Sequence, residues 1–188
     1  MLRHLPPSLA RRALRLTLAG TVACGASGIA VGAFASSAQA LDVVTCGGSE
    51  VTSFSPALTE RPQSVLASTT TLYQPCVNVL RPLELRTGVA SGTVGPTVRT
   101  CDDLLTARTG QRTVRWSTGT TSTFSFISTV TALRGGVLQV VQQGSITAGE
   151  FSGDTAVGVV LLTQSDLDAC ATTGVASLGG TVTLTIAL

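Results

Sequence analysis

The chain lacks the side chains on which most enzymes depend. Its 188 residues include no lysine, and its single histidine and single methionine are His4 and Met1. Ser-His-Asp and Cys-His mechanisms need an imidazole to carry a proton, and Schiff-base and Ser-Lys mechanisms need a lysine. Residues 41–188 also contain no glycine-rich loop with phosphate-binding spacing. These absences exclude those classes of enzyme, and we expect no catalytic residue and no cofactor.

The first forty residues have the three parts of a secretory signal. A basic opening holds four arginines, an uncharged stretch runs from Leu16 to Ala35, and Ala38-Gln39-Ala40 forms a cleavage motif. We therefore predict a signal peptide at residues 1–40 with cleavage after Ala40. A membrane anchor, an acylated Cys24 and twin-arginine export are the alternatives, and the export route stays open.

The remaining residues, 41–188, have the length of a single domain. We expect this domain to be secreted, either released or held at the cell wall, with no membrane span after cleavage. Four of the twelve arginines lie in the signal, so residues 41–188 hold eight arginines against ten acidic residues. A net charge of about −2 offers no basic surface, and we expect no nucleic-acid partner.

Four cysteines remain after cleavage, because Cys24 leaves with the signal. They are Cys46, Cys76, Cys101 and Cys170. Exported chains usually oxidise an even set of cysteines, and zinc is excluded because there is no C-x-x-C pair and no histidine. We expect two disulfides. Of the three connectivities that four cysteines allow, we choose Cys46–Cys76 and Cys101–Cys170, because sequential pairing closes a first hairpin and then clamps the rest.

Residues 41–188 are rich in β-branched side chains, with 27 threonines and 19 valines. This composition favours strands over helices. The expected strands are Val51–Phe54, Ser64–Tyr73, Gly88–Val94, Val137–Gln143, Thr155–Thr163 and Thr181–Ile186, with single helical turns at Asp102–Leu105 and Ser165–Asp168. With seven to nine short strands, we predict an all-β antiparallel sandwich, Ig-like or related, with a β-barrel as the alternative.

Two segments allow a finer prediction. Alternation on both sides of a break at residues 117–120 predicts a hairpin between Thr113 and Thr131. We expect its Trp116, Phe124 and Phe126 to be core residues, because aromatic side chains supply large apolar areas and residues 41–188 contain six of them. The continuous apolar run at residues 159–162, with Val157 before it, indicates a strand that is covered on both faces or lies at the centre of a sheet.

Paired carboxylates are the remaining route to acid–base hydrolysis, as in glycoside cleavage. The candidates are Glu50, Glu60, Glu84, Asp102, Asp103, Glu150, Asp154, Asp166 and Asp168. Most of these must be surface charges, because ten acids in 148 residues are few. Asp166 with Asp168, or Glu150 with Asp154, could contribute oxygen ligands to calcium, but neither pair matches a full calcium loop. We therefore expect no metal site.

Arginines cluster at residues 108–115, where Arg108, Arg112 and Arg115 precede Trp116. This segment is a candidate interaction loop, and a protease inhibitor could present Arg108 or Arg112 from it. The alternative is a solvated hairpin edge, where arginines discourage pairing between edges.

Four segments resemble uncharacterised small secreted proteins of actinobacteria. They are Cys46-Gly47-Gly48, residues 113–119, residues 144–153 and Asp168-Ala169-Cys170. The resemblance implies export, a β-rich disulfide-bonded domain and no assigned activity. Our leading hypothesis is a non-enzymatic binding or structural module with an unidentified extracellular or cell-wall partner. A protease inhibitor that uses residues 108–115 and a carboxylate-based glycoside hydrolase are the alternatives.

Overall fold

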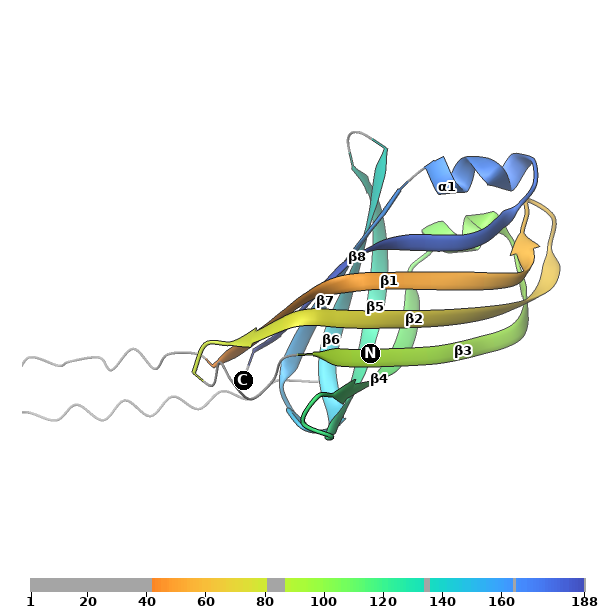
Figure 1. Cartoon of the computed structure of the whole chain (residues 1–188). Helices are drawn as coiled ribbons and strands as arrows, with labels where there is room; N and C mark the ends of the chain where they lie inside the picture. The colour runs from red at the N-terminus through yellow and green to blue at the C-terminus, as the bar shows by residue number, and fades with distance from the viewer. Residues whose placement is uncertain (1–41, 81–86, 134–135, 164, 188) are drawn as a thin grey trace, which may run out of the picture. The chain divides into compact units, whose positions relative to one another are not determined.

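A computed structural model describes residues 42–80, 87–133, 136–163 and 165–187 (Figure 1). The strands are β1 (Val43–Leu58), β2 (Gln63–Asn78), β3 (Gly88–Arg99), β4 (Arg108–Trp116), β5 (Thr121–Leu133), β6 (Val137–Gly149), β7 (Thr155–Thr163) and β8 (Val175–Ala187). The short helices are η1 (Cys101–Leu105), α1 (Ser165–Asp168) and η2 (Ala169–Ala171). The expected signal peptide and Glu84 lie outside the described residues.

The eight strands form one closed antiparallel barrel. Each strand pairs with its neighbour in the chain, and β8 pairs back with β1 from Val43↔Ala187 to Leu58↔Val175. The all-β prediction is confirmed, but the sandwich is wrong and the alternative, a barrel, is correct. The alternation that buries one face of each strand is compatible with either architecture. Pairing between the first and last strands closes this sheet on itself, although the ladder between β3 and β4 has only three pairs.

The period-two pattern of the strands sorts side chains between the inside and the outside of the barrel. On β8, Val182, Leu184 and Ile186 are buried and the threonines between them point outward. The predicted hairpin is present as β4 and β5, with Trp116 and Phe124 buried and Phe126 half-buried. The apolar run lies in β7, a central strand that pairs with β6 on one side and β8 on the other. It is not covered on both faces, because a barrel wall has a solvent side, and Leu161 stays 38% exposed there.

Apolar side chains fill the barrel in two clusters. The first core contains Trp116, Phe124, Tyr73 and the inward side chains of β8. The second core contains Phe54, Leu58, Val65 and Leu178, with Leu104 of η1 and Leu167 of α1 packed against it. Along β1, Cys46 belongs to the first core and Phe54 to the second, and Glu50 lies between them. The two cores therefore leave a polar zone in the middle of the barrel.

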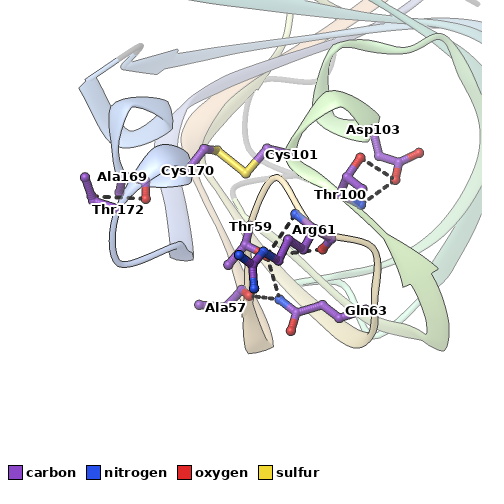
Figure 2. The surroundings of a disulfide bond; sticks show 10 residues. All are labelled: Ala57, Thr59, Arg61, Gln63, Thr100, Cys101, Asp103, Ala169, Cys170 and Thr172. Atoms are coloured by element: carbon purple, nitrogen blue, oxygen red, sulfur yellow. Dashed lines mark hydrogen bonds between the residues drawn. A yellow bond between two sulfur atoms is a disulfide. The ribbon is translucent and has the colours of Figure 1, made fainter.

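Two disulfides connect the chain in the pairing that we expect from the sequence. Cys46–Cys76 joins two directly paired positions of β1 and β2. Cys101–Cys170 joins η1 to η2 across one end of the barrel (Figure 2). The amide of Cys101 also donates a hydrogen bond to the carbonyl of Thr59 in the turn after β1, at 3.0 Å. Disulfides of this kind indicate an oxidising environment.

The helical content of the chain is small. Within the described residues, no helix has the length and the apolar character needed to cross a membrane.

Candidate functional site

The arginine segment is a strand of the barrel wall, so the candidate interaction loop at residues 108–115 is not a loop. The alternative, the edge of a hairpin, is closer to the structure, because β4 pairs with β5 along its length and with β3 at only three positions. Residues Arg108–Trp116 form β4, paired with β5. Arg112 has the phase of the buried Val114 and Trp116, so its side chain points into the barrel and is 11% exposed. Arg108 lies on the same inner face, whereas Arg115 is exposed on the outer face. Arg112 therefore lies inside the barrel and is not displayed to a partner.

Arg112 is part of a buried polar cluster that spans β1, β2 and β4. Its Nη1 lies 2.8 Å from Oε2 of Glu50 and donates a hydrogen bond to the Tyr73 hydroxyl at 3.0 Å. The Thr71 hydroxyl donates to the same Glu50 oxygen at 2.8 Å. The guanidinium also lies over the Phe126 ring, 5.8 Å from its centroid. A buried ion pair thus receives two neutral hydroxyl partners and an aromatic face.

Burial and charge act in opposite directions on this cluster. Burial lowers the pKa of Arg112, but the attraction of Tyr73 and Glu50 and their hydrogen bonds outweigh it and leave that pKa raised. Burial raises the pKa of the Tyr73 hydroxyl, although Arg112 opposes the shift. Because both pKa values are raised, Arg112 is charged and the Tyr73 hydroxyl is neutral at neutral pH. The cluster is therefore a fixed set of polar groups in the barrel interior.

A partly open cavity of about 220 Å³ lies beside this cluster. Its wall includes Glu50, Thr52 and Thr69 from the polar zone, Arg99, Asp103 and Arg108 near η1, and apolar side chains of Phe54, Val94, Leu104, Val130, Val140, Leu162 and Leu178. The cavity thus combines charged groups at its border with an apolar wall, which is typical of small-molecule sites.

A cleft of about 340 Å³ lies in the barrel wall between β3 and β4. These strands pair at three positions, from Gly88↔Trp116 to Ala90↔Val114, and the described ladder ends there. Beyond that point the cleft is bordered by Ser91, Gly92, Arg112 and Phe126. Thr69 and Val94 line both the cleft and the cavity, so the two spaces adjoin.

Gly110 lines this cleft and leaves room for the Phe126 ring. A Cβ at Gly110 would lie 2.7 Å from the Phe126 ring. Any larger residue would displace the aromatic ring over which the Arg112 guanidinium lies.

The helical turn η1 borders the cavity through a network at Asp103. Thr100 and Asp103 form a capping box, in which Oδ2 of Asp103 accepts the Thr100 amide at 2.7 Å. Oδ1 accepts Nη2 of Arg108 at 2.6 Å. The hydrogen bond from the Thr100 backbone is the largest influence and lowers the pKa of Asp103. Burial opposes it, but the charges of Arg108 and Arg99 lower the pKa further, so the net shift is downward. Asp103 is therefore an anion that orients η1 and Arg108.

Two of the nine candidate carboxylates, Glu50 and Asp103, line the same cavity. Each is ion-paired with an arginine, and the lowered pKa of Asp103 is opposite to what a general acid requires. The arrangement is suited to binding and lacks the features of an acid–base pair.

The other candidate carboxylates have separate surroundings. Glu150 accepts a hydrogen bond from the Thr120 hydroxyl beside the β6–β7 turn, and Asp154 ends that turn. Glu60, Asp102 and Asp168 are exposed. The side chain of Asp166 lies outside the described residues. Where the structure describes the chain, no three His, Cys, Asp or Glu side chains are grouped to hold a metal ion.

Sequence reasoning missed Tyr73, Thr71, Arg99 and Gln142 as polar residues of the interior. Gln142 is 6% exposed, and its Oε1 has no hydrogen-bond partner among the described residues. For Arg112 a signal was present, because counting back in steps of two from Trp116 and Val114 places it on the core face.

No family model matches the chain, and neither a curated protein nor a solved structure matches it. The described residues define an eight-stranded antiparallel barrel with a cavity that has charged groups at its border and an apolar wall.

Proposed function

We propose that this protein is a secreted, non-enzymatic barrel that binds a small molecule in its interior cavity. The observation that carries the proposal is the cavity between the two cores, bordered by the Glu50–Arg112 pair. An eight-stranded barrel either fills its interior with side chains or holds one small ligand. Here the chain packs both ends and keeps a central space with charged groups, which are costly to bury.

The volume and the access route support this proposal. Cavity and cleft, at about 220 and 340 Å³, adjoin through Thr69 and Val94. Together they reach the size of ordinary small-molecule sites, which is about 300–1,000 Å³. The cleft between β3 and β4 offers a route through the wall that needs no opening of the capped end.

Export is part of the proposal. It is supported by the signal-like residues 1–40, by the two disulfides, and by the resemblance to small secreted actinobacterial proteins. The sequence predicts an unidentified extracellular or cell-wall partner, and we propose that this partner is a small ligand. The inhibitor hypothesis loses its basis, because residues 108–115 form a strand.

The test places a phenylalanine side chain in the cavity and, in a control variant, the same side chain on the outer face of the barrel. Thr69 faces both spaces, whereas its neighbour Thr70 is exposed on the outer face of β2. Purified wild type, Thr69→Phe and Thr70→Phe are titrated with the neutral fluorescent probe N-phenyl-1-naphthylamine. Circular dichroism checks that all three are folded.

We expect saturable fluorescence enhancement with the wild type and with Thr70→Phe, and at least a severalfold weaker response with Thr69→Phe. Equal binding by all three proteins would place the probe on the outer surface. No binding by the wild type, either of this probe or of its anionic analogue 1-anilinonaphthalene-8-sulfonate, would remove the cavity as a ligand site. Either result rejects the proposal.

A further inference from the structure

The charges around the cavity and the cleft do not balance. Three arginines line these spaces, Arg99, Arg108 and Arg112, against two carboxylates, Glu50 and Asp103. The described lining therefore holds one positive charge in excess. In a space that is partly shielded from water, charge interactions are stronger than in bulk water, so this excess favours a ligand with one negative charge.

Two of the three arginines already have a carboxylate. Arg112 pairs with Glu50 at 2.8 Å and Arg108 with Asp103 at 2.6 Å. Both Asp103 oxygens are engaged, one by Arg108 and the other by the Thr100 amide. Asp103 is thus committed to holding η1 and Arg108 in place.

Arg99 is the arginine that makes no ion pair among the described residues. Its Nε donates to the Thr97 hydroxyl at 2.9 Å, and its two terminal nitrogens have no hydrogen-bond partner among the described residues. The side chain is half-buried at the last position of β3 and borders the cavity. Burial, followed by the nearby charge of Arg108, lowers the pKa of Arg99, and the opposing charge of Asp103 does not cancel this shift. An anion in contact with the terminal nitrogens would offset both effects.

We propose, building on the proposed function, that the ligand is a small amphipathic acid whose anionic group binds Arg99, with Arg108 beside it. Guanidinium groups bind carboxylates and phosphates through paired N–H donors. The two terminal nitrogens of Arg99 are available for such a contact, because only its Nε is engaged by Thr97. Leu104, Val130, Val140 and Leu162 provide the apolar wall for the body of the ligand. The acid group and the apolar wall together define the ligand class.

The experiment uses two probes that share one ring skeleton. 1-Anilinonaphthalene-8-sulfonate carries one negative charge, and N-phenyl-1-naphthylamine lacks the sulfonate. Their dissociation constants are measured for the wild type, Arg99→Gln and Arg61→Gln. Arg61 is an exposed arginine in the turn after β1 (Figure 2), so its variant removes the same charge without touching the cavity wall.

We expect the wild type and Arg61→Gln to bind the sulfonate about tenfold more tightly than the neutral probe, as one charge-assisted contact implies. Arg99→Gln should lose this preference and keep its affinity for the neutral probe. The kind of acid is identified by displacing the sulfonate with octanoate and with octyl phosphate, each compared with octan-1-ol.

The outcomes separate the inference from the proposed function. Equal binding of both probes by the wild type, or displacement by octan-1-ol as strong as by both acids, overturns the anionic ligand and keeps a binding barrel. A preference that survives in Arg99→Gln overturns the role of Arg99. Failure of both probes to bind rejects the proposed function itself.

Discussion

At the scale of single residues, the most unusual feature is a charged pair in the middle of a small barrel. The side chains of Glu50 and Arg112 are 12% and 11% exposed. Taking both charges out of water costs several kcal/mol, which their mutual attraction offsets when hydrogen bonds complete the geometry. Thr71 and Tyr73 supply those bonds. Removing one partner therefore leaves a buried charge without compensation.

The first prediction concerns this pair. Glu50→Gln should lower the free energy of unfolding by about 3 kcal/mol, because Arg112 keeps its charge and loses its carboxylate. The double variant Glu50→Leu/Arg112→Met should lose less free energy of unfolding than the sum of the losses in Glu50→Leu and Arg112→Met. Urea denaturation measures all of these. Arg115→Met, exposed on the same strand, is the control and should change stability by about 0.5 kcal/mol or less. A Glu50→Gln value equal to this control would contradict a stabilising pair.

The second prediction concerns Tyr73, the single tyrosine of the chain. Its pKa is raised above the ordinary value of 10.0, chiefly by burial. The unfolded chain therefore ionises first, so stability should be complete below pH 10.0 and fall as the pH rises from there through the native pKa. The chain contains no lysine and the four described cysteines are in disulfides, so few other groups titrate in this range.

Tyrosinate absorbance of native and urea-unfolded protein measures the two pKa values directly. In Tyr73→Phe this part of the pH dependence of unfolding should vanish. Native titration at or below the ordinary value would show that the hydroxyl is solvated.

At the scale of elements, the two sides of β3 differ. The strand pairs with β2 along most of its length, from Gln63↔Arg99 to Tyr73↔Gly88, but with β4 only from Gly88 to Ala90. The inner face of the barrel opens at the cleft where this second ladder ends. In contrast, β1 is paired along both sides by β2 and β8. The wall is therefore weakest between β3 and β4.

The third prediction follows from this difference in pairing. Amides of residues 91–99 that are not bonded to β2 should exchange with deuterium well before the amides of β1, because local opening there breaks no second ladder. Hydrogen exchange followed by mass spectrometry measures this. A saturating ligand in the cleft should slow exchange at these positions. Protection in β3 equal to that in β1 without ligand would show that the seam is closed in solution.

At the scale of the whole molecule, the two disulfides have different tasks. Cys46–Cys76 joins positions that the β1–β2 ladder already places opposite each other. Cys101–Cys170 connects two short helical segments that cover the end of the barrel, next to the residues of the cavity wall. Only the second bond therefore holds the position of η1, which carries Asp103 and orients Arg108.

The fourth prediction separates these tasks. Sequence separations of 30 and 69 residues correspond to about 3.6 and 4.4 kcal/mol of loop-closure stabilisation. Cys46→Ala/Cys76→Ala should lose stability but keep probe affinity once folded. Cys101→Ala/Cys170→Ala should lose both, because η1 and Arg108 are released. Urea denaturation and titration with the sulfonate probe, at a temperature where both variants are folded, measure the two effects. Equal affinities would show that the cap does not shape the site.

The sequence alone was sufficient for several properties. The absence of lysine from the chain, and of histidine from residues 41–188, argued against mechanisms that need an amine or an imidazole. The threonine and valine content together with period-two alternation predicted an all-β domain and the β4–β5 hairpin. Its four cysteines predicted two disulfides. These properties are local or compositional, because alternation depends on neighbouring residues and decides which side chains share a face of a strand.

The tertiary structure decided the closure of the barrel and the site inside it. Closure depends on the twist and register of all eight strands together, and the sequence pattern of a single segment does not determine these. Glu50 and Arg112 were each visible as candidates, but their pairing joins β1 to β4 across the interior. Once the sheet closed, the inner face of an arginine-rich strand became the wall of a cavity. A segment that the sequence indicated as either an interaction loop or a solvated hairpin edge therefore lines the cavity and the cleft.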